Sequence, residues 1–308
     1  MSFPGGFGRP GSGIPSQDDF MATAKTVLLT GASSGFGLLS AVTLAKRGWQ
    51  VIATMRDLGR REKLDAAAKE ANVVERIEIR ELDVTNHEHI GTLANSVAER
   101  AVPLHGLVNN AGFAMAGFAE NVSDAELRKQ FETNFFGAAA VTRAFLPQLK
   151  RQGFGHIVMV SSLSGRVGFP GVGSYAASKF ALEGWAETLR FEMRPFGVPV
   201  VLLEPGAFET DIWTRNGLVS EKTLALGADP DSPEGARIAR WRKKLEARKS
   251  RPNPQLVADF LAGILANPKP RLRYSFGTDA WSALALRTFL PWSWFEGMIV
   301  KASGIERT

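Results

Sequence analysis

From Thr26 onward the chain alternates between two kinds of segment. Short runs rich in β-branched and other aliphatic residues alternate with longer stretches whose apolar residues recur at helical spacing. Seven runs have the composition of strands: TVLL, QVIAT, RIEIREL, LHGLVNN, HIVMVSS, VPVVLLE and RLRYSFG. Strands separated by helices in this way form a parallel sheet with helices on both faces. The alternation therefore predicts a doubly wound α/β fold with a seven-stranded sheet.

The same pattern indicates how the chain is organised into domains. Residues 1–20 contain five glycines and three prolines with no apolar period, which predicts a flexible tail. No internal repeat and no second linker divides the remainder, so we expect one domain over residues 21–308. Within this domain, residues 207–252 are expected to form a substrate lid, and residues 278–308 an apolar C-terminal extension.

Composition excludes several classes of protein. With 308 residues, 44% hydrophobic and 22% charged, the chain can bury a full core, unlike a disordered or fibrous protein. It has neither a long uninterrupted apolar run nor an N-terminal signal pattern, so no membrane span and no secretion are predicted. Cysteine is absent, which excludes disulfides, thiolate metal ligands and a cysteine nucleophile. We therefore expect a cytoplasmic protein without a metal site.

The net charge of +6 is concentrated in one segment. Eight basic residues and one acid lie between Arg237 and Arg251, and the rest of the chain is close to neutral. A general nucleic-acid-binding surface is therefore not predicted. Ile238, Trp241 and Leu245 recur at helical spacing in this segment. The pattern fits a solvated helix with a core-facing seam, or a helix that lies on a membrane surface.

The first strand runs into the glycine-rich sequence TGASSGFG, at residues 30–37, and from there directly into a helix. In this position Gly31 permits a tight turn. Gly35 and Gly37 allow a pyrophosphate and the strand to approach the backbone where the helix begins. A plain strand-to-helix turn is the alternative, because glycine-rich turns alone are weak evidence. The place of the turn after the first strand favours a dinucleotide site.

The sequence SYAASK places Tyr175 four residues before Lys179 in a segment with a helical pattern. Residues four apart project from one face of a helix, about 6 Å apart at Cβ, so the ammonium can lie near the phenol. A nearby cation favours phenolate, and lowering the tyrosine pKa to neutrality requires about 4 kcal/mol. The alternative is a pair that only packs on the helix. Ser162, thirteen residues before Tyr175 at the end of an apolar strand, favours a catalytic site.

These features occur with further motifs in the order and spacing of one family. The motifs are TGxxxGxG at 30–37, LDV at 82–84, NNAG at 109–112, Asn134, SS at 161–162, Tyr175 with Lys179, and PG at 205–206 with Thr210. On these motifs, over residues 26–210, the chain resembles the short-chain dehydrogenases/reductases. The resemblance implies a Rossmann fold and hydride transfer between NAD(P) and a ketone, aldehyde or alcohol. The sequence ATMRDL and the C-terminal tail resemble hydroxysteroid and retinol dehydrogenase-like members.

The resemblance implies four catalytic residues. Tyr175 exchanges a proton with the substrate oxygen, and Ser162 donates a hydrogen bond to that oxygen. Lys179 lowers the pKa of Tyr175 and hydrogen-bonds the nicotinamide ribose. Asn134 holds a water that connects Lys179 to solvent, with a helical asparagine satisfied by the backbone as the alternative. Ser161, the neighbour of Ser162, is expected to point to the other face of the strand.

The resemblance also implies which residues bind the cofactor: Gly31, Ser33, Ser34, Gly35, Phe36, Gly37, Arg56, Asp83, Val84, Asn110, Ala111, Gly112, Tyr175, Lys179, Pro205, Gly206 and Thr210. At the end of the second strand, Met55 stands where NAD-using relatives place an acid. The arginine after it, Arg56, suits a 2′-phosphate. We therefore expect NADP, whereas NAD is favoured if Asp57 receives the ribose hydroxyls instead.

The C-terminal third indicates the substrate only in outline. Residues 207–216 follow a strand end and are expected to cover the substrate, with Thr210 on the cofactor and Phe208, Ile212 and Trp213 facing the substrate. The stretch DAWSALALRTFLPWSWFEGMIV contains three tryptophans in an apolar setting. Both features fit a bulky lipophilic ketone or alcohol. Core packing or a dimer contact explains the tail equally well.

The resemblance further implies an oligomer. The helices with Asn134 and Tyr175 form the usual interface of the family, so we expect a homodimer or homotetramer. A second class of function is open, in which the fold binds a dinucleotide without turnover, as a redox sensor or scaffold. Loss of Tyr175 or Lys179 would indicate that class. Both residues are present, which favours an enzyme.

Overall fold

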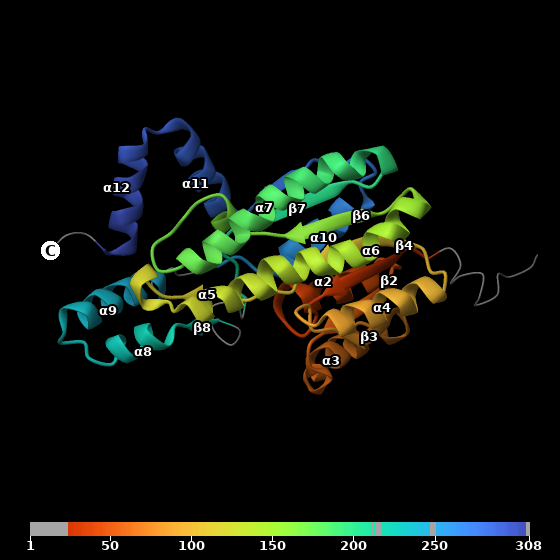
Figure 1. The fold of residues 1–308 in the computed structure, drawn as a ribbon, viewed down its shortest axis with the longest axis horizontal. Coiled ribbons are helices and arrows are strands. Elements are labelled where there is room, and N and C mark those ends of the chain that lie inside the picture. Colours follow the sequence, from red (N-terminus) through yellow and green to blue (C-terminus); the bar gives the residue numbers. More distant parts are fainter. Residues whose placement is uncertain (1–23, 211, 213–216, 247–250, 306–308) are drawn as a thin grey trace, which may run out of the picture.

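The computed structural model describes residues 24–210, 212, 217–246 and 251–305, so the tail expected over residues 1–20 lies outside it. Seven parallel strands form the main sheet in the order β3-β2-β1-β4-β6-β7-β9 (Figure 1). Their bounds are β1 Thr26–Thr30, β2 Gln50–Met55, β3 Ile77–Glu81, β4 Leu104–Asn109, β6 His156–Val160, β7 Val200–Pro205 and β9 Arg273–Phe276. Each strand falls within or overlaps one predicted run, and the doubly wound α/β fold is confirmed.

Helices cover both faces of this sheet (Figure 1). One face carries α2 (Gly35–Lys46), α3 (Glu62–Glu70) and α10 (Gln255–Ala266). The other carries α4 (His87–Glu99), α6 (Ala138–Gln152) and α7 (Gly173–Met193), with α5 (Asp124–Phe131) leading into α6. The five inner strands of the sheet bury almost all of their side chains, which explains their mostly aliphatic sequences, whereas the edge strands β3 and β9 are only partly buried.

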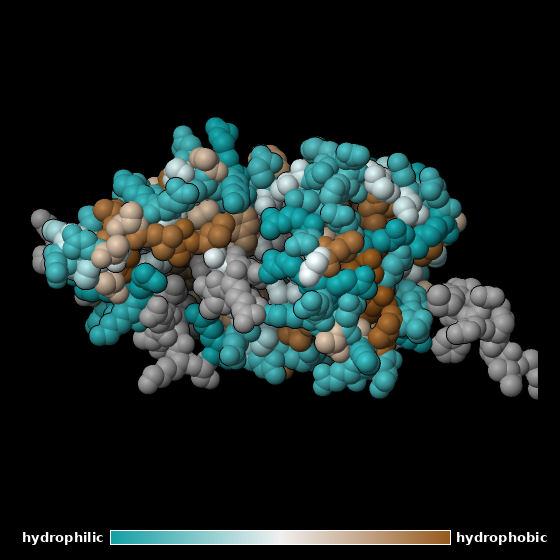
Figure 2. All heavy atoms as spheres, turned by 90° about the horizontal axis from the view of Figure 1, so that it is seen from below, coloured by the Kyte–Doolittle hydropathy of each residue, from teal (hydrophilic) through white to brown (hydrophobic). Residues whose placement is uncertain are grey.

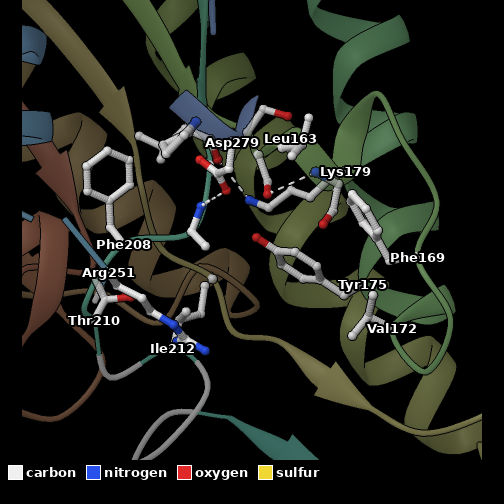
Figure 3. Close-up of a pocket in the computed structure, with 18 of the residues that line it drawn as sticks. Leu163, Phe169, Val172, Tyr175, Lys179, Phe208, Thr210, Ile212, Arg251 and Asp279 are labelled. Atoms are coloured by element: carbon white, nitrogen blue, oxygen red, sulfur yellow. Dashed lines mark hydrogen bonds between the residues drawn. The ribbon is translucent and has the colours of Figure 1, made fainter. Parts of the chain in front are cut away.

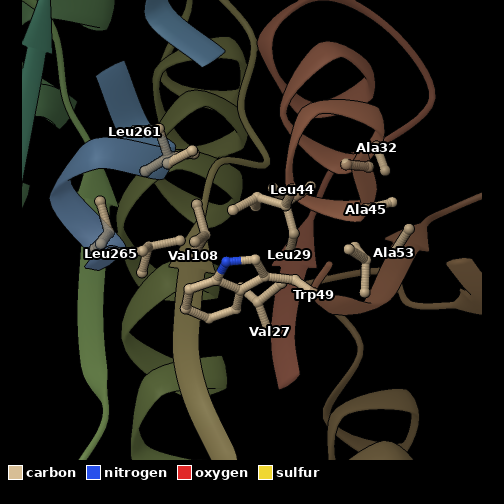
Figure 4. Close-up of a cluster of buried hydrophobic side chains, with 14 of the residues drawn as sticks. Val27, Leu29, Ala32, Leu44, Ala45, Trp49, Ala53, Val108, Leu261 and Leu265 are labelled. Carbon is tan, nitrogen blue, oxygen red and sulfur yellow. The ribbon is translucent and has the colours of Figure 1, made fainter. Parts of the chain in front are cut away.

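Trp49 is a central packing residue on the α2 face. Its indole is buried among Val27, Leu29, Leu44 and Leu265, where the sheet meets α2 and α10 (Figure 4). Replacing a tryptophan of this kind with alanine costs about 3–5 kcal/mol, because the loss leaves a cavity. The packing fixes α2 against the sheet, and with it the glycine-rich turn at the start of α2.

A buried cluster of charges joins β7, β9 and α7. Glu204 is fully buried and accepts hydrogen bonds from Ser275 Oγ at 2.6 Å and from Arg166 Nη1 at 3.2 Å. The Nε of Arg273 lies 3.2 Å from Glu183 Oε2 and 3.3 Å from Glu204 Oε1, so one guanidinium serves two buried carboxylates. Burial and the neighbouring Glu204 raise the pKa of Glu183 to about 7. The cluster anchors the last strand of the sheet to α7.

Two additions follow the strands of the sheet. The two-residue strands β5 (Met115–Ala116) and β8 (Leu218–Val219) pair in parallel, and β8 leads into α8 (Glu221–Gly227) and α9 (Pro233–Glu246). After β9, α11 (Thr278–Phe289) and α12 (Trp292–Ser303) form a helical hairpin. Both additions lie at the same end of the molecule (Figure 1). The view from below shows hydrophobic side chains gathered at this end (Figure 2).

Helix α9 has the core-facing seam expected of the basic segment. Ile238 and Trp241 are buried, and Trp241 lies 5.6 Å from Phe118, measured between ring centroids. The Trp241 indole also donates a hydrogen bond to Pro170 O at 3.1 Å. The seam therefore faces the protein, and the basic residues of the helix are left on its other side.

Candidate active site

The glycine-rich turn joins β1 to α2 at the carboxyl edge of the sheet. Gly31 has a φ of +73°, and a Cβ atom there would lie 2.8 Å from Ala111 Cα. A Cβ on Gly37 would lie far inside van der Waals contact with the Gly31 carbonyl, so Gly37 serves the packing of the turn. Ser34 makes no capping hydrogen bond to α2, and the first turn of α2 contains no acid. The N–H groups where α2 begins can therefore hold an anion.

The first cavity lies along this turn and the neighbouring strand ends. Most of the residues predicted to bind a cofactor line it: Gly31, Ser33, Ser34, Gly35, Phe36, Arg56, Asp83, Val84, Asn110, Ala111, Gly112 and Thr210. Gly37 does not line it. Arg60, Lys129 and Thr133 also line it, although their sequence positions carry no motif that marks them.

Asn110 connects the two loops that form the floor of this cavity. Its Nδ2 donates to Thr30 O at 2.9 Å and to Gly31 O at 3.0 Å. In return, Thr30 Oγ1 accepts hydrogen bonds from the backbone N–H groups of Asn110 and Ala111, each at 3.0 Å. These bonds hold the NNAG loop against the glycine-rich turn, which gives a physical reason for the amide side chain at this position.

The end of β2 supplies the charged part of the first cavity. Met55, Arg56, Asp57 and Arg60 line it. The Oδ1 atom of Asp57 accepts a hydrogen bond from Gly59 N at 2.8 Å and so caps the short 3-10 turn over Leu58–Arg60. One oxygen of Asp57 is therefore engaged by its own loop, and two guanidinium groups flank it.

A second cavity adjoins the first. It contains the predicted residues Ser162, Tyr175, Lys179, Pro205, Gly206 and Thr210. Apolar side chains form much of its remaining wall: Leu163, Phe169, Val172, Phe208, Ile212 and Trp241 (Figure 3). Phe208 and Ile212 face the cavity as predicted, whereas Trp213 lies outside the described residues. The cavities have six lining residues in common: Phe36, Asn110, Gly112, Phe113, Thr210 and Ile212.

Ser162 and Tyr175 meet at the wall of the second cavity. Ser162 follows β6, and its hydroxyl accepts a hydrogen bond from Ser164 N at 3.1 Å and bonds the Tyr175 hydroxyl. Tyr175 is 4% exposed, and burial raises its pKa to about 12, while the bond with Ser162 acts in the opposite direction. The side chain is therefore a neutral phenol at neutral pH. The Ser161 hydroxyl lies near Gly165 and Glu183, but Ser161 also lines the second cavity, so the two serines are not fully separated by the strand.

Lys179 lies one helical turn from Tyr175 on α7. Its ammonium is 5.9 Å from the centre of the Tyr175 ring and donates a hydrogen bond to Val160 O at 2.8 Å (Figure 3). Burial lowers the pKa of Lys179 to about 8, although Glu183 attracts its charge. Burial has the largest effect on the pKa of Tyr175, and it raises that pKa. The protein alone therefore does not lower the pKa of the phenol toward 7.

Asn134 lies in a π-helical turn, over Glu132–Gly137, between α5 and α6. Its Nδ2 donates to Phe113 O at 3.0 Å and to Ser178 Oγ at 3.1 Å, and its Oδ1 accepts from Phe113 N at 3.1 Å. A Cβ on Gly112 would lie 3.1 Å from this Oδ1 and 3.8 Å from Lys179 Nζ, so Asn134 is beside Lys179. The amide is largely satisfied by the protein, and one lone pair of Oδ1 remains for a water.

Asp279 is a site residue that the motifs did not reveal. Its carboxylate, in the first turn of α11, lines the second cavity and accepts a hydrogen bond from Ala207 N at 2.7 Å. A Cβ on Gly206 would clash with Asp279 Oδ1. The PG motif therefore ends in glycine so that the start of α11 can dock on the loop after β7.

The three C-terminal tryptophans take no part in either cavity. Trp281, Trp292 and Trp294 are 68%, 60% and 68% exposed, and none of them lines a cavity wall. Core packing, which the apolar setting suggested equally well, is therefore wrong for these side chains. The helices bury Ala280 and Phe295 instead, because these residues face inward against Leu163 and Val167.

Two further classes of site were searched in the described part of the chain. These residues contain no cluster of histidine, aspartate or glutamate arranged to hold a metal ion. Nor is any helix among them long and apolar enough to span a membrane.

A glycine-rich turn at the carboxyl edge of a parallel sheet, beside a buried serine, tyrosine and lysine, defines a dinucleotide-dependent oxidoreductase of the α/β class. The chain belongs to the short-chain dehydrogenase family, whose family model, described as short chain dehydrogenase, matches residues 25–218. It is 39% identical to the uncharacterized oxidoreductase YusZ of Bacillus subtilis, over 90% of this chain and 98% of that protein. It is 38% identical to human retinol dehydrogenase 8, over 82% of this chain and 81% of that protein.

Solved structures agree on the fold. A short-chain dehydrogenase from Streptomyces avermitilis superposes with a TM-score of 0.74 at 33% identity, over 92% of this chain and 97% of that one. An alcohol dehydrogenase from Thermococcus sibiricus was crystallised with 5-hydroxy-NADP. It is 26% identical and superposes with a TM-score of 0.65, over 82% of this chain and 96% of that one. A short-chain dehydrogenase/reductase from Burkholderia phymatum was crystallised with NAD. It is 27% identical and superposes with a TM-score of 0.71, over 86% of this chain and 93% of that one. The chain is thus an NAD(P)-dependent oxidoreductase of this family.

Proposed function

We propose that this protein is an NADP-preferring dehydrogenase/reductase that interconverts a lipophilic alcohol and its ketone or aldehyde. The observation that carries the proposal is the bonded Ser162–Tyr175 hydroxyl pair where two cavities adjoin, with Lys179 buried one helical turn away. The larger cavity passes the glycine-rich turn, and the other is lined mainly by apolar side chains.

The proposed chemistry assigns a separate task to each residue. The dinucleotide, when bound, supplies or accepts the hydride. The Tyr175 hydroxyl gives a proton to the substrate oxygen in reduction and takes one in oxidation. Ser162 donates a hydrogen bond to the same oxygen and orients it. Lys179 holds the nicotinamide ribose and, when its ammonium turns from Val160 O toward Tyr175, favours the phenolate.

The first cavity fits a dinucleotide. The positive φ of Gly31 and the close approach of Ala111 leave no space for a side chain on the turn, and the start of α2 offers N–H groups to a pyrophosphate. Residues 31–36, with Asn110, Ala111, Gly112 and Thr210, would hold its central part, and Asp83 and Val84 the adenine. Pro205 and Gly206 border the nicotinamide end from the second cavity.

The preference for NADP rests on charge at the end of β2. Arg56 and Arg60 both line the first cavity, and Met55 presents no carboxylate to ribose hydroxyls. Asp57 has one oxygen bonded to Gly59 N, which reduces its capacity to receive both hydroxyls of an NAD ribose. Two guanidinium groups suit a 2′-phosphate better than a diol.

The substrate class follows from the second cavity. Aromatic and aliphatic side chains form much of its wall, among them Leu163, Phe169, Phe208 and Trp241, and the charged side chains of Lys244, Arg251 and Asp279 line other parts of it. Pockets of this composition select substrates by the apolar area they bury. The relative named retinol dehydrogenase 8 is consistent with a lipophilic alcohol or aldehyde. Residues 207–210 and 212, with α8 and α9, are proposed to act as the substrate lid.

The oligomer expected from the family is also supported by exposed aromatic residues on the relevant helices. Phe136, in the π-helical turn, is 51% exposed, and Phe180 on α7 is 42% exposed. We propose that these faces pair in a homodimer or homotetramer, because monomers seldom expose large aromatic side chains on adjoining helices. Light scattering of the purified protein tests this assignment, and a monomer that persists at high concentration would contradict it.

The test of the proposed function is a turnover assay with a matched variant. Purified protein is mixed with NADPH or NADH and a panel of steroids, retinoids, fatty aldehydes and small ketones, and the absorbance of the reduced nicotinamide is followed. Tyr175→Phe removes only the phenolic oxygen, so turnover should fall by about 100-fold or more while dinucleotide binding persists. Near-normal turnover in Tyr175→Phe would refute the assigned role. Dinucleotide binding without turnover on any substrate would favour the redox-sensor or scaffold function.

A further inference from the structure

The hairpin of α11 and α12 has two unlike faces. Its inner face buries Ala280 and Phe295 and contributes Asp279, Ala302 and Ser303 to the wall of the second cavity. The hairpin lies beyond β9, to one side of the sheet (Figure 1). It is therefore both a part of the substrate cavity and a surface element.

The outer face is made of large apolar side chains. We call these five residues the outer aromatic face: Trp281 and Phe289 on α11, and Trp292, Trp294 and Met298 on α12. Phe289 is 83% exposed, and three of the others are tryptophans that are 60% exposed or more. Trp281 and Phe289 are eight residues apart, and Trp294 and Met298 four, so each pair shares one side of its helix. Such a concentration of exposed aromatic residues marks an interaction surface.

Cations lie beside the C-terminal end of the hairpin. Helix α12 packs on α9, and a Cβ on Gly304, the residue after α12, would lie 3.0 Å from Lys244 Cγ. Helix α9 carries four exposed basic residues, Arg240, Arg242, Lys243 and Lys244, of which Lys244 also lines the second cavity. Within the described ranges, none of these four forms an ion pair with an acid.

The hairpin itself adds further cations. Arg287 stacks over the Trp292 ring at 5.6 Å, and Lys301 is exposed in the last turn of α12. Glu296 is an exposed carboxylate between them. With α9 included, the charge around the outer aromatic face is strongly positive, which is complementary to an anionic surface.

We infer that the outer aromatic face and the α9 cations dock on an anionic phospholipid surface. Tryptophan side chains favour the headgroup level of a bilayer, and each lysine or arginine near anionic headgroups contributes about 1 kcal/mol. Each helix of the hairpin has 12 residues, which is too short to span a bilayer, so the contact is peripheral.

The consequence of membrane docking for substrate access rests on the proposed function. Ala302 and Ser303 place the second cavity directly behind the docked hairpin. A lipophilic alcohol or aldehyde dissolved in the bilayer then reaches Tyr175 along the inner face of the hairpin, without crossing bulk water. Docking itself does not require turnover, so the two can be tested separately.

The experiment is sedimentation of the full chain with vesicles of phosphatidylcholine, with and without phosphatidylserine. We expect binding to the phosphatidylserine vesicles that weakens as salt is raised. The triple variant Trp281→Ser, Phe289→Ser, Trp294→Ser should lose at least about tenfold in vesicle affinity. Phe191→Ser is the matched control, because Phe191 is 67% exposed on α7, outside the hairpin, and should leave binding unchanged.

A second variant covers the case in which the triple variant does not fold. Arg242→Glu with Lys243→Glu changes only exposed residues and should also lose about tenfold on phosphatidylserine vesicles. Tyr175→Phe should still bind, which separates docking from catalysis. No binding by the wild type, or binding by both surface variants as tight as that of the wild type, would overturn the inference. So would a wild-type dimer that the triple variant converts to a monomer while vesicles bind neither, because a second copy would then cover the face.

Discussion

Replacing Lys179 with methionine should stabilise the dinucleotide-free protein at neutral pH while it impairs catalysis. The ammonium of Lys179 is 5% exposed, and burial lowers its pKa from 10.5 to about 8. A lysine whose pKa is lowered on folding holds its proton more weakly in the folded than in the unfolded chain. Its stability penalty is therefore complete below pH 8 and disappears as pH rises from 8 through 10.5.

The size of the effect follows from the two pKa values. The difference between 10.5 and about 8 corresponds to about 3 kcal/mol at neutral pH. Methionine has no charge and a similar length, but it leaves Val160 O without its donor, which costs about 1 kcal/mol. The net gain is about 2 kcal/mol at pH 7, or roughly 3 °C in melting temperature for a chain of this size. At about pH 9.5 the gain should fall close to zero, because the folded wild type no longer carries the charge.

Calorimetry without dinucleotide at both pH values measures this difference. Lys269→Met, at an exposed position, is the control and should differ from wild type by less than about 1 °C at either pH. A second measurement follows catalysis, where Lys179→Met should weaken dinucleotide binding and move the pH–rate profile to alkaline values. A variant that melts below wild type at both pH values, or by the same margin at both, would refute the reasoning. Weaker dinucleotide binding with an unchanged pH–rate profile would refute only the pKa role.

Three further substitutions probe other parts of the molecule. Arg56→Ala should weaken NADPH about ten- to hundredfold with little effect on NADH, measured by titration at fixed low salt. Selective weakening of NADH by Asp57→Ala would instead identify Asp57 as the ribose acceptor. Arg273→Met should cost about 3–5 kcal/mol in urea unfolding, since it leaves buried Glu183 without its guanidinium partner and Glu204 with Arg166 alone, and a loss below about 1 kcal/mol would contradict this reasoning. Gly206→Ala should lower the melting temperature, and adding Asp279→Ala should recover part of it by removing the clash.

The five inner strands of the main sheet were predictable because almost all of their side chains are buried, whereas the edge strands β3 and β9 are only partly buried. Continuous aliphatic runs such as residues 200–203 have no other stable place in a chain of this composition. Strands β5 and β8 have two residues each, too few for any pattern. The π-helical turn around Asn134 could not be predicted either, because the sequence of this segment has the pattern of a continuous helix.

Some residues of the candidate site could likewise be predicted from the sequence, and others could not. The residues that line the cavities from the glycine-rich turn and α7 were predictable, because fixed spacings along a single element place them. Asp279 and Arg60 were not, because their positions depend on how distant segments dock. The C-terminal tryptophans show the same limit, since an apolar stretch does not reveal whether anything packs opposite it. Trp241, which stands between the exposed Arg240 and Arg242 in the sequence, is buried, whereas Trp281 is exposed.

The wall common to the two cavities has a kinetic consequence. Phe36, Asn110, Gly112, Phe113, Thr210 and Ile212 belong to both. A dinucleotide that fills the first cavity therefore completes the floor on which an alcohol or carbonyl compound rests in the second. Loading in the reverse order would leave the smaller molecule without that floor and would obstruct entry of the larger one. The shared wall therefore favours an ordered sequence in which the dinucleotide is the first to arrive and the last to leave.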